Sequence, residues 1–347
     1  MASEISKHVF RKGVILVNVG TPDSPSVADV RRYLREFLTD PRVLTMSTLG
    51  RWLLVNLIIA PLRGPKSAKA YQTIWTKRGS PLREHGENLA LALQEHLGPQ
   101  YVVRLGMRYG SPSMEGVVKE LMDQLQVEGL ILVPLYPQYS SSATGSSIEK
   151  LNDILRGRAV MPAVRVVGDF YSHKGFISSF ASLAQQCIDS FNPDHVLMSY
   201  HGLPEMHVKA STSGFCFSEK NCCAQLTNKN RFCYRAQCFE TSRRLAAALG
   251  LSEQKYSVSF QSRLGKIPWI QPFTDKILAD LYQRGVRRLA VTVPSFVADC
   301  LETIEEIGDR ARDDWMALGG EAFALIPSLN VDHNWVKALG EIVRGEC

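Results

Sequence analysis

Short apolar segments alternate with helical patterns along almost the whole chain, and this alternation most constrains the fold. Strands are expected over 13–20, 101–110, 129–137, 163–170, 195–202, 256–263, 288–296 and 321–330. Helical patterns lie between most of them, over 80–97, 113–127, 174–191, 239–249, 273–284 and 299–317. Strands separated by helices of this length are typical of βαβ units. The sequence therefore predicts an α/β fold with a mainly parallel, doubly wound sheet.

An internal repeat divides the chain into two similar halves. Three landmarks recur in the same order: "LVNVGTP" and "LMSYHGLP", then "YVVRLGMRYGSPSMEGVVKEL" and "YSVSFQSRLGKIPWIQPFTDKIL", then "LILVPLYP" and "LAVTVPSF". We therefore expect two Rossmann-like domains, residues 1–160 and 161–347, each a four-stranded parallel sheet flanked by helices. A cleft is expected between them, because ligands of such folds bind beyond the carboxyl ends of the strands. Neither a Gly-x-Gly-x-x-Gly nor a Walker loop follows a strand, which disfavours a nucleotide.

Charge and hydropathy narrow the partners. The formal net charge of +6 suits an anionic substrate or an anionic membrane surface, and the absence of a Lys/Arg run argues against nucleic acid. The N-terminal segment does not read as a signal peptide, so a reducing, cytoplasmic location is expected. The apolar run 52–62 is too short to cross a bilayer. Residues 46–75 combine apolar side chains with basic ones, which fits either a membrane-facing lip or a helix packed on the core.

Two candidate catalytic groups follow expected strands. His201 ends the strand 195–202, where a neutral imidazole can act as a base or a metal ligand, or simply bond within a turn. The segment after the strand 288–296 places carboxylates at helical spacing, which fits a cation or proton path leading to Glu302, or a solvated acidic face. The members of this series are Asp299, Glu302, Glu306, Asp309 and Asp313, of which the outer two favour the solvated face.

The segment 135–150, "LYPQYSSSATGSSIEK", is expected to run from a strand through a hydroxyl-rich loop into a helix. Backbone N–H groups and hydroxyls at a helix N-terminus bind carboxylates and phosphates well. The alternative is a flexible loop in which Ser146 or Ser147 caps the helix.

The chain as a whole resembles the ferrochelatases, enzymes that insert ferrous iron into a porphyrin. The resemblance rests on "ILVNVGTP", "SAKAYQTIWTKRGSPL", "LYPQYSSSATGSS", "SYHGLP", "FQSRLGKIPWIQP" and "PSFVADCLETIEEI", in this order. It implies an α/β fold with a porphyrin cleft between the two domains. It also implies that residues 46–62 form the apolar lip of the pocket and contact a membrane peripherally.

The resemblance assigns roles to individual residues. His201 matches the active-site histidine, a ligand of the incoming Fe²⁺ and an acceptor of pyrrole protons, and Glu302 matches the carboxylate facing it. The proton or metal path is implied for Asp299 and Glu306, and porphyrin contacts for Arg108, Tyr109, Tyr139 and Phe296. One departure is Cys300, which stands where many relatives carry a second histidine. Any role given to that imidazole is in doubt for this chain.

Five of the eight cysteines lie within 23 positions of the segment 205–238, an insertion of the C-terminal half. They are Cys216, Cys222, Cys223, Cys233 and Cys238. In a reducing compartment metal binding is a better interpretation than disulfides. The missing Cys-x-x-Cys pair weakens a zinc ribbon, whereas four thiolates can hold a [2Fe–2S] cluster, and one bacterial group of ferrochelatases carries such a segment here. Zinc and free or redox-sensing thiols stay open as alternatives, with Cys222 or Cys223 as the spare thiol.

The substrate predicted is protoporphyrin IX, with protohaem as product and no electron transfer. The alternatives are coproporphyrin III as substrate, a related chelatase that loads another metal, and a non-catalytic tetrapyrrole or iron–sulfur sensor on the same scaffold. The sequence leaves monomer and homodimer open.

Overall fold

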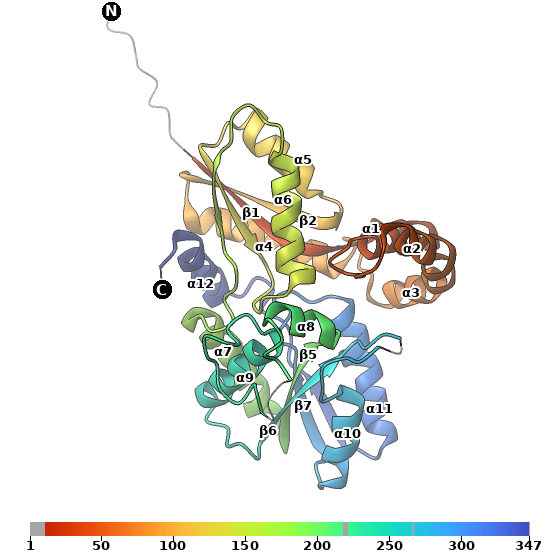
Figure 1. Cartoon of the computed structure of the whole chain (residues 1–347). Coiled ribbons are helices and arrows are strands. Elements are labelled where there is room, and N and C mark those ends of the chain that lie inside the picture. The colour runs from red at the N-terminus through yellow and green to blue at the C-terminus, as the bar shows by residue number, and fades with distance from the viewer. Residues whose placement is uncertain (1–10, 218–220, 266, 347) are drawn as a thin grey trace, which may run out of the picture.

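A computed structural model describes residues 11–217, 221–265 and 267–346. The first ten residues and Cys347, which belong to the two predicted domains, lie outside the described part, as does one residue of the "FQSRLGKIPWIQP" motif. Eight strands form two parallel four-stranded sheets, one in each half of the chain (Figure 1). The predicted fold class is confirmed, and each expected strand is present.

The two sheets have the same topology. Their orders are β2-β1-β3-β4 and β6-β5-β7-β8, and every neighbouring pair is parallel. The internal repeat seen in the sequence is therefore a repeat of the fold. The strands are β1 (Lys12–Thr21), β2 (Tyr101–Gly110), β3 (Gly129–Pro134), β4 (Ala163–Val166), β5 (His195–His201), β6 (Tyr256–Gln261), β7 (Arg288–Thr292) and β8 (Ala322–Leu325).

Helices cover both faces of each sheet, and an arm of helices projects from the N-terminal half (Figure 1). The arm consists of α1 (Val27–Leu38), α2 (Thr48–Leu53), the π-helix η1 (Leu54–Ile59) and α3 (Ala60–Ile74). The other helices of the N-terminal half are α4 (Pro81–Leu97), α5 (Met114–Lys119), η2 (Glu120–Gln124), η3 (Ser141–Gly145) and α6 (Ser146–Leu155). Those of the C-terminal half are α7 (Lys174–Phe191), α8 (Glu205–Ser211), α9 (Tyr234–Ala248), α10 (Thr274–Gln283), η4 (Glu302–Ala311), α11 (Arg312–Ala317) and α12 (His333–Arg344).

One hydrophobic core joins the two halves. It contains Leu16 and Val133 from the first sheet together with Met198, Phe176 and Trp335 from the second half. The last helix, α12, packs against α7 and also against α4 of the N-terminal half. The carboxyl ends of β1 and β5 consequently keep a fixed relation to one another. The predicted division at residue 160 stays a prediction.

Candidate active site

His201 is the last residue of β5, at the carboxyl end of the C-terminal sheet. Its backbone N–H donates to Ser295 Oγ at 3.1 Å, and its ring lies 6.2 Å from that of Phe296. The ring Nδ1 lies 2.6 Å from the carbonyl oxygen of Gly202. Because a carbonyl only accepts, Nδ1 carries a proton in this contact, and in the neutral form of the ring the lone pair is then on Nε2. The half-buried imidazole is therefore oriented through Nδ1 by its own turn.

Gly202 makes the turn after His201 possible. Its N–H donates to the carbonyl oxygen of Gln261 at 2.8 Å, which ties the end of β5 to the end of β6. A Cβ at position 202 would lie 2.7 Å from that same oxygen and 3.3 Å from the Trp269 ring. The close approach of two backbones excludes a side chain here.

Glu302 opens the π-helix η4 and is joined to the His201 turn by Gln261. The buried Gln261 side chain donates to the carbonyl oxygen of Glu302 at 3.0 Å, while its backbone carbonyl accepts from Gly202. The arm packs against the start of η4, where Leu301 and Ile304 contact Tyr71 and its neighbours in α3. Burial, with the Glu302 charge as a lesser contribution, raises the pKa of Tyr71 well above its usual value. The two predicted catalytic groups therefore share neighbours at one strand edge.

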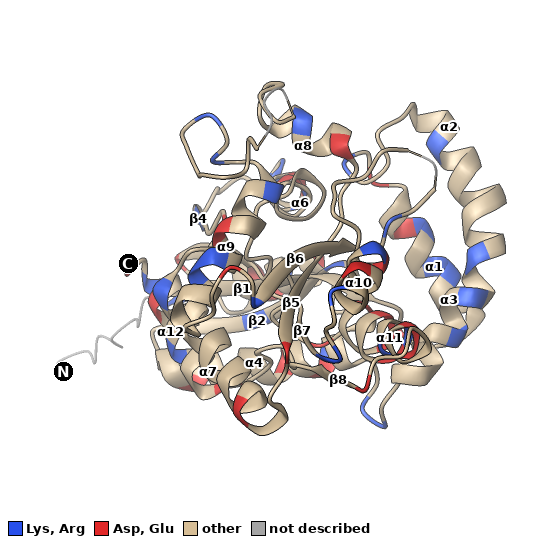
Figure 2. Cartoon of the chain, turned by 90° about the horizontal axis from the view of Figure 1, so that it is seen from below, with Lys and Arg blue, Asp and Glu red and all other residues tan. Residues whose placement is uncertain are grey.

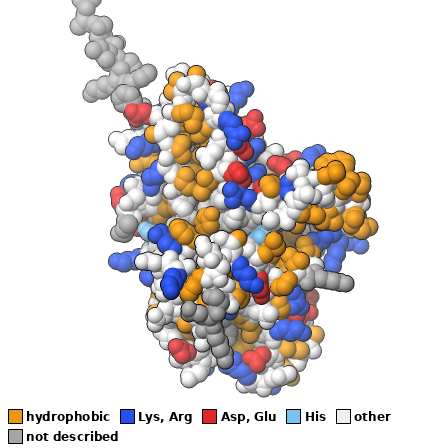
Figure 3. Space-filling model, in the orientation of Figure 1, with side chains coloured by type: hydrophobic (Ala, Val, Ile, Leu, Met, Phe, Trp, Pro, Cys, Tyr) orange, Lys and Arg blue, Asp and Glu red, His pale blue; other side chains and the backbone are white. Residues whose placement is uncertain are grey.

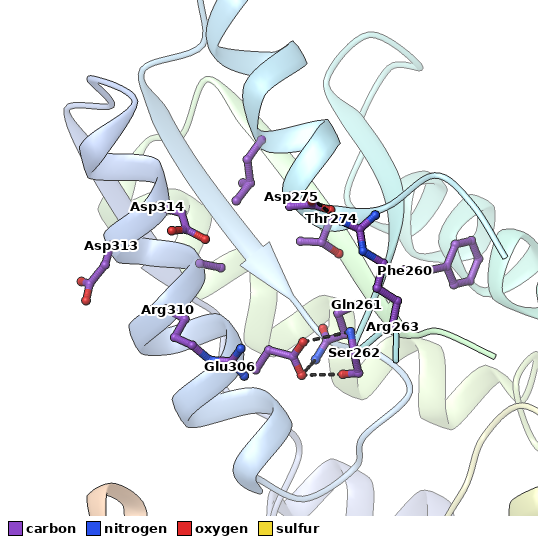
Figure 4. A pocket seen from close by; sticks show the side chains of 12 residues that line it. Phe260, Gln261, Ser262, Arg263, Thr274, Asp275, Glu306, Arg310, Asp313 and Asp314 are labelled. Atoms are coloured by element: carbon purple, nitrogen blue, oxygen red, sulfur yellow. Dashed lines mark hydrogen bonds and ion pairs between the residues drawn. The ribbon is translucent and has the colours of Figure 1, made fainter. Parts of the chain in front are cut away.

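Glu306 lies one turn further along η4 and faces a cavity of about 410 Å³ (Figure 4). Its carboxylate accepts hydrogen bonds from the Ser262 backbone N–H at 2.9 Å and from the Ser262 hydroxyl. Arg310, Asp313 and Asp314 line the same cavity from η4 and α11. The cavity is therefore lined by charged side chains along one side of η4 and α11.

The predicted acidic face differs from the observed one. Asp299 lies in the loop before the helix, where its carboxylate accepts from Thr303, from the Ser328 backbone and from Asn330. Residues 302–311 are π-helical, with i to i+5 hydrogen bonding, so the spacing of an α-helical face does not apply. Asp309 lies 3.5 Å from Arg312 on the surface. Of the series, Glu306 and Asp313 line the cavity of about 410 Å³.

Arg108 and Tyr109 meet a residue that the sequence did not single out, Asp40. One carboxylate oxygen of Asp40 accepts from Arg108 at 2.6 Å, from the Tyr109 hydroxyl at 2.8 Å and from Ser146 Oγ at 2.6 Å. The other oxygen accepts from the Arg42 backbone N–H at 2.7 Å. Burial works to raise the pKa of Asp40, but these donors together lower it below its usual value. Tyr109 is 1% exposed. Its contact with the porphyrin stays a prediction.

The hydroxyl-rich loop is an ordered turn. Ser140 caps the π-turn η3 by accepting from the Ala143 N–H, whereas Ser146 and Ser147 lie inside the helix that follows. The expectation that one of the latter two caps the helix is therefore wrong. Tyr139, at the start of the loop, is half-buried and donates its backbone N–H to Gln237 at 2.6 Å.

A family model described as ferrochelatase matches residues 11–347 of this chain. The chain belongs to the ferrochelatase family. It is accordingly a metal chelatase, a lyase that inserts ferrous iron into a porphyrin in haem biosynthesis.

Individual relatives agree with this assignment. A ferrochelatase from Legionella pneumophila (strain Paris) is 48% identical over 336 residues, which is 96% of this chain and 99% of the relative. One from Coxiella burnetii (strain Dugway 5J108-111) is 47% identical over 333 residues, 96% of this chain and 93% of the relative. The solved structure "SirB from Bacillus subtilis with Fe3+" matches with a TM-score of 0.53 at 11% identity, covering 96% of this chain and 95% of that one. At that identity the last match shows the fold alone.

Cys300, the departure from the second histidine of many relatives, is a buried thiol. Cys300 is 3% exposed and packs with Leu82, Ala298 and Phe296. Burial, together with the neighbouring Glu302 charge, raises the pKa of this thiol well above its usual value. A neutral, apolar group therefore lies beside the first carboxylate of η4.

The cysteine-rich insertion gathers thiols on one side of the same half. Cys216, Cys222 and Cys223 have their sulfur atoms within 4.8 Å of one another, and Cys216 Sγ lies 3.3 Å from Cys233 Sγ. Three mutually close thiols with a fourth beside Cys216 fit a metal–thiolate site, since sulfurs bound to one ion lie about 3.8 Å apart. Cys238 lies one turn into α9, is 0% exposed and faces the Tyr234 hydroxyl.

The arm of the N-terminal half exposes apolar side chains. Figure 3 shows hydrophobic side chains gathered at the right-hand side of the molecule, where the arm projects in Figure 1. Its helices α2, η1 and α3 carry basic residues and no acidic one (Figure 2). Within the described residues, no helix is long and apolar enough to span a membrane. The exposed fractions are 43% for Met46, 70% for Leu49, 52% for Trp52, 41% for Leu53, 63% for Leu57, 51% for Ile58 and 74% for Leu62.

Proposed function

We propose that iron enters the porphyrin between His201 and Glu302, in a cleft between the two halves. The observation that carries this proposal is the contact between His201 Nδ1 and the Gly202 carbonyl, which leaves Nε2 free to accept a proton or bind Fe²⁺. A base is required there because the free porphyrin gives up two N–H protons as the metal enters. Phe296 and Tyr139, both half-buried, are proposed to contact the ring.

The protons need a route away from the ring. We propose that it runs from His201 through Glu302 to Glu306, which faces the water-accessible cavity of about 410 Å³. Ser262 donates two hydrogen bonds to Glu306 and so holds its carboxylate in place as the proposed end of this route. Asp299, Arg108 and Tyr109 are proposed to hold the loops around the ring, since their polar atoms are engaged within the protein.

His201→Ala tests the first proposal. We expect ferrous iron insertion to fall by at least about a hundredfold, the effect of removing a general base, while porphyrin binding measured by fluorescence quenching persists. His333→Ala, an exposed histidine at the start of α12, is the matched control and should insert iron normally. Undiminished turnover in His201→Ala would refute the assignment. Porphyrin binding without turnover in the unmodified protein would instead favour the sensor alternative.

Protoporphyrin IX is the proposed porphyrin. It bears fewer carboxylates than coproporphyrin III and matches the apolar arm beside the site. Steady-state insertion with both porphyrins decides between them, and a higher kcat/KM for coproporphyrin III would overturn the choice.

We also propose that the exposed apolar side chains of the arm dip into an anionic membrane surface. The support is the patch itself together with Arg63, Lys66 and Lys69 on α3 of the same arm. The double variant Leu57→Ser, Ile58→Ser should lose most co-sedimentation with phosphatidylglycerol-containing vesicles. Leu91→Ser, at a position on α4 that is more exposed than either of these two, should not. Equal binding by the two variants would refute the arm as the contact.

The cysteine-rich loop is proposed to hold a [2Fe–2S] cluster through Cys216, Cys222, Cys223 and Cys233, with zinc as the alternative. The support is the close gathering of the Cys216, Cys222 and Cys223 sulfurs together with the short distance from Cys216 Sγ to Cys233 Sγ, which leaves Cys238 as the spare thiol. Such a cluster would supply structural or sensing chemistry, because iron insertion needs no electron. Anaerobically purified protein should be brown, and Cys233→Ser should abolish the colour while Cys238→Ser retains it. Colourless protein containing zinc would establish the alternative. A reducing, cytoplasmic location is also proposed, because clustered cysteines that bind a metal stay reduced there. Cell fractionation tests this location.

A further inference from the structure

Helix α9 begins inside the cysteine-rich loop and ends its first turn against the active site. Cys233 is its N-cap residue, and the Cys233 sulfur accepts from the Ala236 N–H at 3.5 Å. Two residues of the same turn, Tyr234 and Gln237, reach the segments that surround the proposed cleft. Cys233, Tyr234 and Gln237 therefore stand in one helical turn between the thiols and those segments.

Tyr234 contacts the catalytic histidine through the backbone. Its hydroxyl, which is buried with the rest of the side chain, donates to the carbonyl oxygen of His201 at 2.9 Å. The N–H of the same peptide group, at Gly202, is held by the Gln261 carbonyl at 2.8 Å. The peptide plane is thus fixed from both sides. The next carbonyl, that of Gly202, is the acceptor for His201 Nδ1.

Gln237 makes the corresponding contact with the N-terminal half. Its side chain is 0% exposed, accepts from the Tyr139 N–H at 2.6 Å and donates to the Arg231 carbonyl at 2.7 Å. One helical turn therefore binds the histidine turn of one half and the hydroxyl-rich loop of the other.

The loop side of α9 is equally well tied to the cysteines. The 2%-exposed Asn230 donates to the carbonyl oxygens of Cys222 and Gln225, each at 2.8 Å, and its own carbonyl accepts from the Cys233 N–H at 2.8 Å. Cys233 Sγ lies 3.3 Å from Cys216 Sγ. The position of the helix start thus depends on how the thiols are arranged.

We infer that Tyr234 is a positioning residue that makes the tautomer and orientation of His201 depend on the state of the cysteine-rich loop. An intact thiolate site fixes the first turn of α9, Tyr234 then fixes the peptide after His201, and the Gly202 carbonyl holds the proton on Nδ1. Loss of that order frees Nδ1 and lets the proton move to Nε2, which blocks its lone pair. The inference rests on the proposed role of His201.

Tyr234→Phe tests it, because the ring stays and only the hydroxyl is lost. We expect kcat for iron insertion to fall about three- to tenfold, the effect of one hydrogen bond, with the KM for porphyrin unchanged. In protein labelled with ¹⁵N-histidine, the His201 signals, assigned by their absence in His201→Ala, should shift from one Nδ1–H tautomer toward a mixture. Tyr200→Phe is the matched control, since its hydroxyl contacts Ser242 of α9 at 2.8 Å rather than His201. It should lower the melting temperature without changing either readout.

Cys216→Ser separates coupling from a local effect. With Tyr234 present this variant should shift the His201 signals, and with Phe at position 234 it should add no further shift. Unchanged His201 signals in Tyr234→Phe would overturn the inference, as would an equal effect of Cys216→Ser in both backgrounds. Iron insertion by His201→Ala would refute the proposed function instead, whatever the signals in Tyr234→Phe show.

Discussion

The carboxylate of Asp40 offers the sharpest test of how the site is held together. It is 5% exposed and accepts four hydrogen bonds, from Arg108, Tyr109, Ser146 and the Arg42 backbone. Asp40→Asn keeps the shape of the side chain but replaces one acceptor oxygen by a donor. Whichever way the amide is turned, at least one of these donors then faces an N–H₂ group.

The expected cost follows from those contacts. The change removes the charge opposite Arg108, whose side chain is 15% exposed, and it leaves buried donors without an acceptor. Breaking a buried ion pair by changing one partner costs about 3 kcal/mol or more. For a chain of 347 residues the unfolding entropy near the midpoint is about 0.7 kcal/mol/K, so the melting temperature should fall by about 4 °C.

The pH dependence gives the result its direction. The pKa of Asp40 is lowered in the folded protein, so its stabilising contribution is present above the unfolded pKa near 4 and is lost as pH falls through the folded pKa. Unfolding of both proteins in urea at pH 7 and at successively lower pH should therefore show the gap between them shrinking below about pH 4. Asp153→Asn, whose carboxylate pairs with Arg156 at an exposed site, should change stability by no more than about 0.5 kcal/mol. A gap of this small size for Asp40→Asn, or one that widens in acid, would refute the reasoning.

Three further variants probe the strand edge and its sheet. In Gly202→Ala the new Cβ would lie 2.7 Å from the Gln261 carbonyl oxygen. This variant should lower the free energy of unfolding by about 1–3 kcal/mol and reduce iron insertion more than porphyrin binding. Unchanged insertion kinetics would contradict this. Gln261→Ala should reduce kcat with little change in porphyrin affinity, since it frees the Glu302 carbonyl and the end of η4, and Ser257→Ala on the same strand is its control. His195 is buried, and burial is the main reason that its pKa is lowered to about 4. As pH falls from 6.5 to 4, the unfolded chain binds a proton at this histidine while the folded protein does not. The free energy of unfolding should therefore drop by up to about 3 kcal/mol over that range. His195→Gln should flatten that part of the stability profile in urea titrations, and an identical profile would exclude His195 as the cause.

The strands and their repetition could be predicted because their signal is local. A buried parallel strand such as β1 or β5 is a short apolar run, and the order of runs and helices specifies βαβ units. The π-helix η4 could not be predicted in this way. Its i to i+5 bonds add no mark to the residue pattern, and the α-helical spacing wrongly brought Asp299 onto the same face.

Asp40 was missed for a different reason. It follows an amphipathic helix as part of "LTDPRVL", which is an ordinary helix end by sequence. Its importance comes from Arg108 and Ser146, which lie 68 and 106 positions away. Residue pairs at such separation leave no periodic signal, whereas the ends of the strands could be predicted to meet because topology alone brings them together.

The two halves also diverge at equivalent points, and this explains where the specialised parts of the molecule lie. In each half the long insertion stands between the first and second strand: the arm α1–α3 follows β1, and α8 with the cysteine-rich loop follows β5. Both insertions therefore leave the carboxyl end of a strand next to the position where the strand order reverses, which is where ligands bind in such sheets. They touch one another through Thr45 Oγ1 and His207 Nε2 at 3.3 Å. Changes in either insertion can thus reshape the strand edge around His201 without altering the register of either sheet. For this reason two halves with matching sheets can carry different insertions, an apolar arm in one and a cysteine-rich loop in the other.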